Sequence, residues 1–268
     1  MTHEEIKKAF EFFYLSNDLT FDKKKHQYKL GGVTCAGISS ISEYRPKDYL
    51  KFWAAKMVVE YLKDKQKEIK KMSVGQYTEL LLEAKKQHTQ RSKGALQIGT
   101  DTHDWMESYI KGKTKPITKD IEHPVNEFLD FERKHKVRWV CVEKIVCSPT
   151  HLVAGRLDSL AFVDDRLSLL DFKTSNQIDE GYFLQTGGYQ MCLDEMGIPV
   201  EQRIILRLPK TKEDHFEAVL VNTDYEKDKE AFLHLRYAWQ WDNYIDCNFK
   251  EEVVEKGYKV RKLKLLKI

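Results

Sequence analysis

Residues 152–174 read LVAGRLDSLAFVDDRLSLLDFKT, and this stretch decides the fold. It contains two runs of mostly apolar residues, 152–163 and 166–174, on either side of the pair Asp164-Asp165. An acidic pair between two such runs is typical of a tight turn. Because consecutive strands joined by a tight turn pair with each other, the stretch predicts an antiparallel β-hairpin.

The segments on both sides of this hairpin have the patterns of further strands and helices. β-Branched and aromatic runs predict three more strands, and apolar residues spaced three and four apart predict two helices. The strands are residues 137–147, 202–208 and 215–221, and the helices are residues 180–197 and 224–247.

The first half of the chain is predicted to be mainly helical. A short hairpin at residues 19–34, with Gly31-Gly32 as its turn, precedes the helices. A break flanked by Gly94 and Gly99 is expected before the third helix, which Gly112 ends. The four helices are residues 47–71, 75–88, 100–111 and 120–136.

These elements predict a mixed α+β fold of the α/β class, with a central mixed β-sheet flanked by helices. We find neither an internal repeat nor a long linker, so we expect one domain, residues 1–268. It would consist of a mainly helical N-terminal lobe (1–136), a core that contains the sheet (137–247) and a basic C-terminal tail (248–268).

The composition excludes several classes of protein. Lys and Arg number 45 and Asp and Glu 42, which gives a net charge of +3, and no apolar run reaches the roughly 18–20 residues of a membrane span. The five Cys are scattered and odd in number, unlike a disulfide scaffold. Glu4, Glu5 and Glu11 argue against a transit peptide, and the N-terminus lacks the apolar stretch of a signal peptide. We therefore expect a cytoplasmic protein without a membrane partner.

Positive charge gathers in two segments of the chain. Residues 255–268 hold six Lys or Arg and one Glu, and residues 61–71 hold five Lys and two acidic residues. Such segments are typical of a protein that binds a polyanion. For either segment alone, a solvated lysine-rich face is the alternative.

The predicted hairpin brings together charged residues that can bind a metal ion. Asp171 and Lys173 share a face of the second strand because side chains alternate along a strand. Asp158 lies as far before the turn as Asp171 lies after it, so the two carboxylates should lie abreast. Close carboxylates repel unless a cation separates them, and their oxygens suit Mg²⁺ or Mn²⁺. The alternative is a buried Asp–Lys ion pair without a metal ion.

Several short motifs, in a fixed order, resemble those of the PD-(D/E)XK nuclease superfamily, in its RecB-like and phage exonuclease branch. The resemblance covers roughly residues 30–190, and Leu157 stands where the superfamily's name has Pro. The motifs are Gly99-Thr100-Asp101-Thr102-His103 with Glu107, Gly155-Arg156-Leu157-Asp158, Asp171-Phe172-Lys173-Thr174 and Gln185-x-x-x-Tyr189, with weaker likeness around Val33-Thr34 and residues 53–56.

This resemblance implies a restriction-endonuclease-like core and a role for each matching residue. His103, Asp158, Asp171 and the Phe172 carbonyl would hold Mg²⁺ or Mn²⁺, and Lys173 would be the catalytic lysine. The remaining residues would line the site: Gln185 and Tyr189 from the following helix, with Glu107 and Glu143 as further candidates. For each of these four residues, and for His103, the alternative is an ordinary polar side chain at the protein surface or at the edge of a helix, without a role in the site.

Two cofactors known from related patterns are not expected. Some members of this branch hold an iron–sulfur cluster with one upstream Cys and three near the C-terminus, whereas only Cys35 and Cys247 occupy such regions here. Gly112-Lys113-Thr114 is similar to part of a phosphate-binding loop. Glu107 stands where that loop needs Gly, so no nucleotide cofactor is expected.

DNA is the expected partner, and an annealing or single-strand-binding protein is a further candidate. Trp53 and Lys56 share a helix face and could stack on a base and bind a phosphate, or they could be a core Trp with a neighbouring Lys. The candidates for holding a terminal phosphate are Ser39, Ser42 and Arg45.

The resemblance thus implies a metal-dependent DNA nuclease, an exonuclease of phage or bacterial recombination, repair or replication. A structure-selective endonuclease is an alternative enzyme. Two alternatives do not cut DNA: a DNA-binding subunit with a nuclease-like fold, and an α+β interaction protein whose carboxylates form ion pairs.

Overall fold

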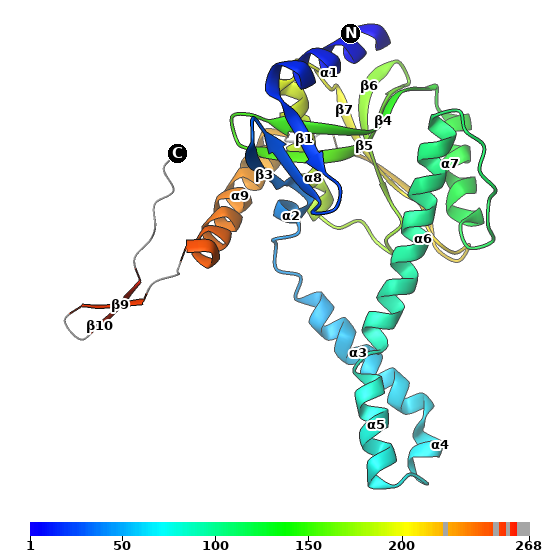
Figure 1. The fold of residues 1–268 in the computed structure, drawn as a ribbon. Helices are drawn as coiled ribbons and strands as arrows, with labels where there is room; N and C mark the ends of the chain where they lie inside the picture. Colours follow the sequence, from blue (N-terminus) through cyan, green and yellow to red (C-terminus); the bar gives the residue numbers. More distant parts are fainter. Residues whose placement is uncertain (222–224, 249–251, 256–257, 262–268) are drawn as a thin grey trace.

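The computed structural model describes residues 1–221, 225–248, 252–255 and 258–261, with side chains through residue 243 in these ranges. The described chain forms a mixed sheet of eight strands with helices on both faces, and a separate C-terminal hairpin (Figure 1). The predicted fold class, a mixed sheet flanked by helices, is therefore confirmed. None of the described helices is both long and apolar enough to cross a membrane.

The elements begin with a helix and short strands and continue as helices, a β-meander and further helices. The strands of the sheet are β1 (Leu19–Asp22), β2 (Gln27–Leu30), β3 (Val33–Gly37), β4 (Val137–Ser148), β5 (Val153–Val163), β6 (Arg166–Lys173), β7 (Gln202–Arg207) and β8 (Glu217–Val221). The helices are α1 (His3–Asn17), α2 (Ile38–Ser42), α3 (Tyr49–Asp64), α4 (Gln66–Ile69), α5 (Val74–Ala84), α6 (Gln87–Ile110), α7 (Glu122–Lys134), α8 (Gly181–Glu195) and α9 (Tyr225–Asn248). The C-terminal hairpin consists of β9 (Glu252–Glu255) and β10 (Tyr258–Arg261).

β4, β5 and β6 form an antiparallel meander, in which β5 and β6 are central strands and β4 pairs only with β5 among the described strands. Ser159 pairs with Leu170, in register with the turn predicted at Asp164-Asp165. Both aspartates have left-handed backbone, with φ of 49° and 67°, as a two-residue hairpin turn requires. α8 then connects β6 to β7, and these two strands pair in parallel.

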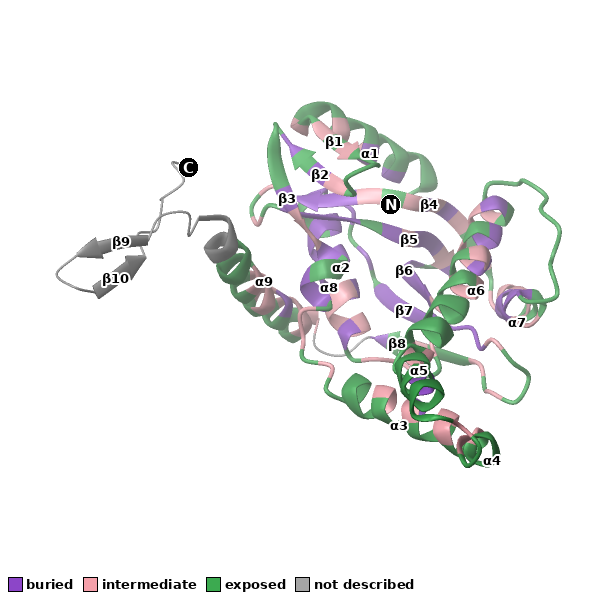
Figure 2. Cartoon of the chain, turned by 60° about the horizontal axis from the view of Figure 1, so that its bottom comes forward, coloured by how far each residue is buried: buried purple, intermediate pink, exposed green. Residues whose placement is uncertain are grey.

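Alternate residues of the central strands enter two hydrophobic clusters, one on each face of the sheet. Leu167 and Leu169 pack with residues of α1, α2, α8 and α9. Leu170 and Phe172 pack with residues of α6 and α7. Figure 2 shows buried residues concentrated in the central strands, whereas α3, α4 and α5 are mostly exposed. A charged side chain on β5 or β6 therefore needs a specific partner, because both faces of these strands are covered.

The helices α3, α4 and α5 and the first half of α6 project from the sheet as an arm (Figure 1). We call residues 49–98 the helical arm. α3 packs against α5 and α6, so the arm is held together by its own helices. Most of the basic tail expected at residues 248–268 lies outside the described residues.

Three expectations for the first half of the chain are wrong. Gly31-Gly32 turns between β2 and β3, with φ of 53° and 81°, so the expected hairpin is a three-stranded meander. The helix expected at residues 47–71 is divided into α3 and α4. The expected break at Gly94 and Gly99 does not exist, because α6 continues through both glycines. α1, which was not predicted, begins with a capping box of Thr2 and Glu5.

A close helix contact explains the adjacent glycines of α8. A Cβ atom on Gly188 would lie 2.9 Å from the ring of Phe232 in α9 and 3.1 Å from Ile38 in α2. For Gly187 the nearest atom belongs to Asp228, also in α9. α8 therefore needs small residues here so that α9 and α2 can approach.

We predict opposite effects for two Gly→Ala substitutions inside helices. Gly188→Ala should lower the free energy of unfolding by about 1–3 kcal/mol, because its methyl group would overlap Phe232. Gly94→Ala should raise it by roughly 0.5–1 kcal/mol, because Gly94 has no neighbour within 4 Å and Ala favours helix. Urea unfolding monitored by circular dichroism measures both. Equal effects of the two substitutions would contradict the described packing.

Candidate metal centre

The candidate centre lies where the pairing of β5 with β6 ends. Ser159 and Leu170 form the last residue pair of this ladder, and Asp158 and Asp171 are the next residues on each strand. Oδ2 of Asp158 accepts a hydrogen bond of 2.7 Å from the backbone N–H of Phe172. A side-chain carboxylate thus replaces a strand carbonyl as the acceptor, which fixes the position of Asp158 on β5 relative to β6.

His103 reaches this position from α6. Its Nε2 lies 3.1 Å from the carbonyl oxygen of Phe172, and its Nδ1 lies 3.9 Å from Oδ1 of Asp158. Gly99 permits the approach, because a Cβ atom there would lie 2.9 Å from Oγ1 of Thr174. When Nε2 donates its hydrogen to the Phe172 carbonyl, Nδ1 carries a lone pair and can act as a metal ligand.

Glu143 approaches from β4, on the other side of β5. Its neighbours Val142 and Lys144 pair with Ser159 and Leu157, so Glu143 lies opposite Asp158. The backbone of Glu143 is left-handed, with φ of 54°, which is unusual for a non-glycine residue within a strand. Strained backbone of this kind occurs at functional sites, where the surrounding structure maintains it.

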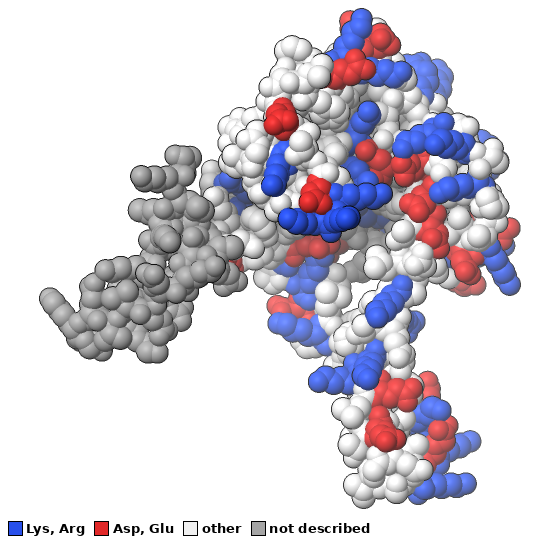
Figure 3. All heavy atoms as spheres, viewed as in Figure 1, with Lys and Arg blue, Asp and Glu red and all other residues white. Residues whose placement is uncertain are grey.

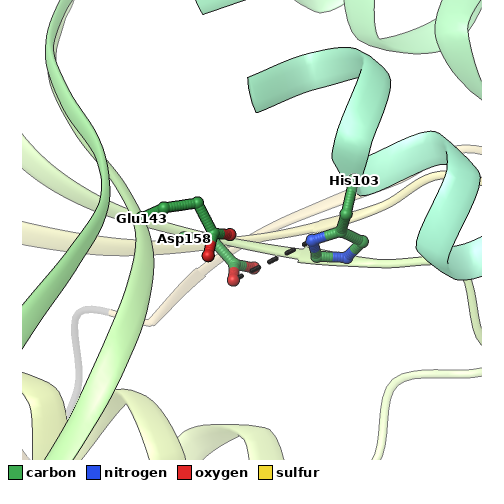
Figure 4. Close-up of side chains that lie close together, drawn as sticks. All are labelled: His103, Glu143 and Asp158. Atoms are coloured by element: carbon green, nitrogen blue, oxygen red, sulfur yellow. Dashed lines mark ion pairs between the residues drawn. The ribbon is translucent and has the colours of Figure 1, made fainter. Parts of the chain in front are cut away.

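His103, Glu143 and Asp158 form a compact group of potential metal ligands. One ligand atom from each of them lies within 4.8 Å of the others (Figure 4). Nitrogen and carboxylate oxygen donors in this number suit a divalent cation. The group is therefore compatible with a divalent metal ion.

Asp171 lies beside this group but is not a member of it. Its side chain is 1% exposed, and no described group donates a hydrogen bond to its Oδ1. Nζ of Lys173 lies 2.6 Å from Oδ2 and forms an ion pair with it. A buried carboxylate oxygen without a donor is costly, and a bound cation next to it would compensate that cost.

Two carboxylates of the centre, Glu143 and Asp171, hold their protons more strongly than free side chains do. Burial and the neighbouring charge of Asp158 raise the pKa of Glu143 to about 7, against the attraction of Arg156. Burial is also the main cause that raises the pKa of Asp171 to about 6. The negative charges are therefore not fully compensated by the protein, as expected where a cation completes a site.

Lys173, Gln185 and Tyr189 surround the carboxylates on the side of α8. Gln185 donates hydrogen bonds to the Tyr189 hydroxyl, at 3.0 Å, and to Oγ of Ser39, at 3.3 Å. Tyr189 is buried, and burial together with the charges of Asp158 and Asp171 raises its pKa. The predicted residues of α8 thus lie beside the two aspartates. Ser39, which accepts the hydrogen bond from Gln185, is exposed at the surface.

Glu107 lines the same cavity as the centre, but it forms an ion pair with Lys111 rather than a bond to His103. The candidates for base stacking and phosphate binding in the first long helix lie in the helical arm. Trp53 is half-buried against His88 in the helical arm, and Lys56 is exposed and lies 3.7 Å from Glu60.

The residues proposed to cradle a phosphate do not form one site. Ser42 does not fit this role, because it is buried and its hydroxyl donates to the carbonyls of Ile38 and Ser39. Arg45 is engaged in an ion pair of 2.7 Å with Glu180.

A cavity of about 910 Å³ opens onto the centre. His103, Glu143 and Asp158 contribute to its wall together with the cations Arg156 and Lys210, neither of which was predicted to have a role. Arg156 belongs to the Gly155-Arg156-Leu157-Asp158 motif, whereas no sequence pattern marks Lys210. Figure 3 shows acidic side chains in the central part of this face, with Lys and Arg around them.

We predict that Mn²⁺ binds this centre with an affinity that decreases below about pH 7. Protons compete with the metal ion first at Glu143 and then at Asp171, whose pKa values are about 7 and about 6. Isothermal titration calorimetry at about pH 8, 7 and 6 measures this dependence. Glu143→Gln should bind Mn²⁺ more weakly, and its affinity should no longer change near pH 7. Glu127→Gln on α7, where the carboxylate also lies next to a His, should behave as wild type. An affinity that does not change with pH would contradict the assignment.

Comparisons with known proteins give little further information. No protein-family model and no curated protein matches the chain. The chain is similar to a solved structure from Eubacterium rectale that is described as a presumed exonuclease, with a TM-score of 0.36 and 14% identity. The match covers 54% of this chain and 68% of the other. A TM-score this low does not establish a shared fold, so the function has to be inferred from the site.

Proposed function

We propose that the protein is a metal-dependent nuclease that hydrolyses phosphodiester bonds of DNA as an exonuclease. One observation carries the proposal. Asp158, Glu143 and His103 converge beside the buried pair of Asp171 and Lys173, at the wall of a cavity that also exposes cations. Carboxylates, an amine and a surrounding positive charge are what metal-assisted phosphodiester hydrolysis requires.

In this proposal His103, Asp158 and Asp171 hold Mg²⁺ or Mn²⁺, and Glu143 and the Phe172 carbonyl are further donors. The buried Oδ1 of Asp171, which has no donor among the described residues, supports the inclusion of this residue, although Asp171 lies outside the compact group of three. When bound, such an ion polarises the phosphodiester and offsets the negative charge that develops on its oxygens.

Lys173 acts as a cation in this proposal. Burial lowers the pKa of Lys173, but the negative charges of Asp171 and Asp158 outweigh burial and raise the pKa above its ordinary value. Lys173 is therefore protonated at neutral pH and donates hydrogen bonds. It can position an attacking water and stabilise negative charge on the phosphate.

Gln185 and Tyr189 hold the other side of the site. Because Gln185 donates to the oxygen of the Tyr189 hydroxyl, the hydroxyl hydrogen stays free to donate into the site. This arrangement positions one further hydrogen-bond donor next to the two aspartates without adding charge.

The test is degradation of end-labelled linear DNA in the presence of Mg²⁺ or Mn²⁺. We predict that Asp158→Asn, Asp171→Asn and Lys173→Met each lower the rate by at least about 100-fold, because each removes a charge needed at the phosphate. Asp165→Asn is the matched control, since Asp165 is an exposed carboxylate at the other end of the same hairpin.

The substrates separate the remaining alternatives. Closed circular DNA should stay intact if the enzyme is an exonuclease, whereas a structure-selective endonuclease would cut branched or circular forms. A wild-type protein that binds DNA without cutting it would support a binding subunit. Unchanged activity of Asp171→Asn or Lys173→Met would reject the assigned site.

A further inference from the structure

Two cations lie on either side of the acidic centre, and the proposed hydrolysis gives neither of them a specific contact. Arg156 belongs to β5, and Lys210 lies in the loop that follows β7; both line the cavity. β6, which carries Asp171 and Lys173, lies between β5 and β7 in the sheet. A chain of phosphates that crosses the strands at this level would therefore meet one cation before the centre and one after it.

Arg156 is held in a fixed orientation by the centre itself. Its Nε lies 2.6 Å from Oε2 of Glu143, whose side chain is only 17% exposed. The guanidinium remains accessible, since the side chain of Arg156 is 45% exposed. Among the described residues none accepts a hydrogen bond from Nη1 or Nη2. The two terminal N–H groups of a guanidinium match two oxygens of a phosphate, so Arg156 offers a preoriented phosphate-binding fork.

Lys210 is held next to the end of β6. Its ammonium group donates to the carbonyl oxygen of Thr174, the residue after β6, which leaves further N–H groups free. The loop is fixed by Arg207, which is 2% exposed. Arg207 forms ion pairs of 2.7 Å with Asp214 and Glu217 and donates to the carbonyl of Asn176. The position of Lys210 therefore depends on a buried anchor rather than on a free surface loop.

We propose that Arg156 and Lys210 bind the phosphates that flank the cleaved one, so that the nucleic-acid strand crosses the sheet from β5 toward β7. This inference depends on the proposed nuclease function and specifies how the substrate backbone is held. Both side chains contact the substrate, and neither takes part in proton transfer.

The test is fluorescence anisotropy of labelled single-stranded and duplex oligonucleotides with the full chain. Metal-free buffer with EDTA, and parallel samples with Ca²⁺, allow binding to be followed apart from metal-dependent cleavage. Arg156→Gln and Lys210→Gln should each weaken binding roughly tenfold at low salt. Each should also lower the slope of log affinity against log salt by about 0.7 for single strands or about 0.9 for duplex. Arg156→Lys should keep the slope but bind more weakly, since it keeps the charge and loses the fork.

Matched controls come from the far end of β4. Arg138→Gln and Lys136→Gln remove exposed cations that pair with Asp165 outside the cavity, and their salt slopes should equal that of wild type. Thermal unfolding by circular dichroism identifies variants that lose binding only because they are destabilised.

The outcomes distinguish the two proposals. Wild-type protein that neither binds nor cuts DNA would overturn the proposed function. Wild-type protein that cuts DNA, together with unchanged affinity and salt slope in Arg156→Gln or Lys210→Gln, would overturn this inference and leave the function intact.

Discussion

Mutual repulsion among carboxylates governs the centre of this protein. Asp158, Asp171 and Glu143 are placed on neighbouring strands at one level of a sheet that is covered on both faces. Lys173 and Arg156 compensate part of this charge, and the raised pKa values of Glu143 and Asp171 show that the compensation is incomplete. Uncompensated carboxylates lower the free energy of unfolding, whereas a purely structural ion pair, in which the two charges balance, would not require this loss.

The surrounding elements hold the cluster rigidly. The hairpin turn sets the register of β5 and β6, and the hydrogen bond from Phe172 fixes Asp158 where that register ends. α6 delivers His103 because Gly99 lets the helix approach Thr174, and α8 delivers Tyr189 from the opposite face. Each ligand therefore comes from an ordered helix or strand, which is the arrangement that keeps a metal site preorganised.

Local sequence patterns predicted the hairpin and the alignment of Asp158 with Asp171. A two-residue turn sets the register of the two strands, so the partner of each residue follows from its distance to the turn. The same counting could not place Glu143. β4 contains an irregularity between Trp139 and Cys141 and a left-handed residue at Glu143 itself, and neither has a sequence signature. Only the resemblance to nucleases suggested this residue.

Other differences arise from tertiary contacts that a sequence does not display. Gly94 and Gly99 were expected to flank a break between two helices, yet α6 continues through both, and its second half is packed in the core through Trp105 and Met106. Ser42 was a candidate for holding a terminal phosphate, but its neighbours Ile38 and Ile41 carry the short α2 into the core and bury it. In both cases burial of apolar side chains outweighed the local preference.

The continuity of α6 gives the molecule a mechanical property. This helix has 24 residues, so it extends about 36 Å as one rod. One end belongs to the helical arm and the other end is embedded beneath the sheet, with His103 between them. The helical arm and the imidazole that lies 3.9 Å from Asp158 thus belong to one uninterrupted helix, so a load on the arm reaches the centre without an intervening loop.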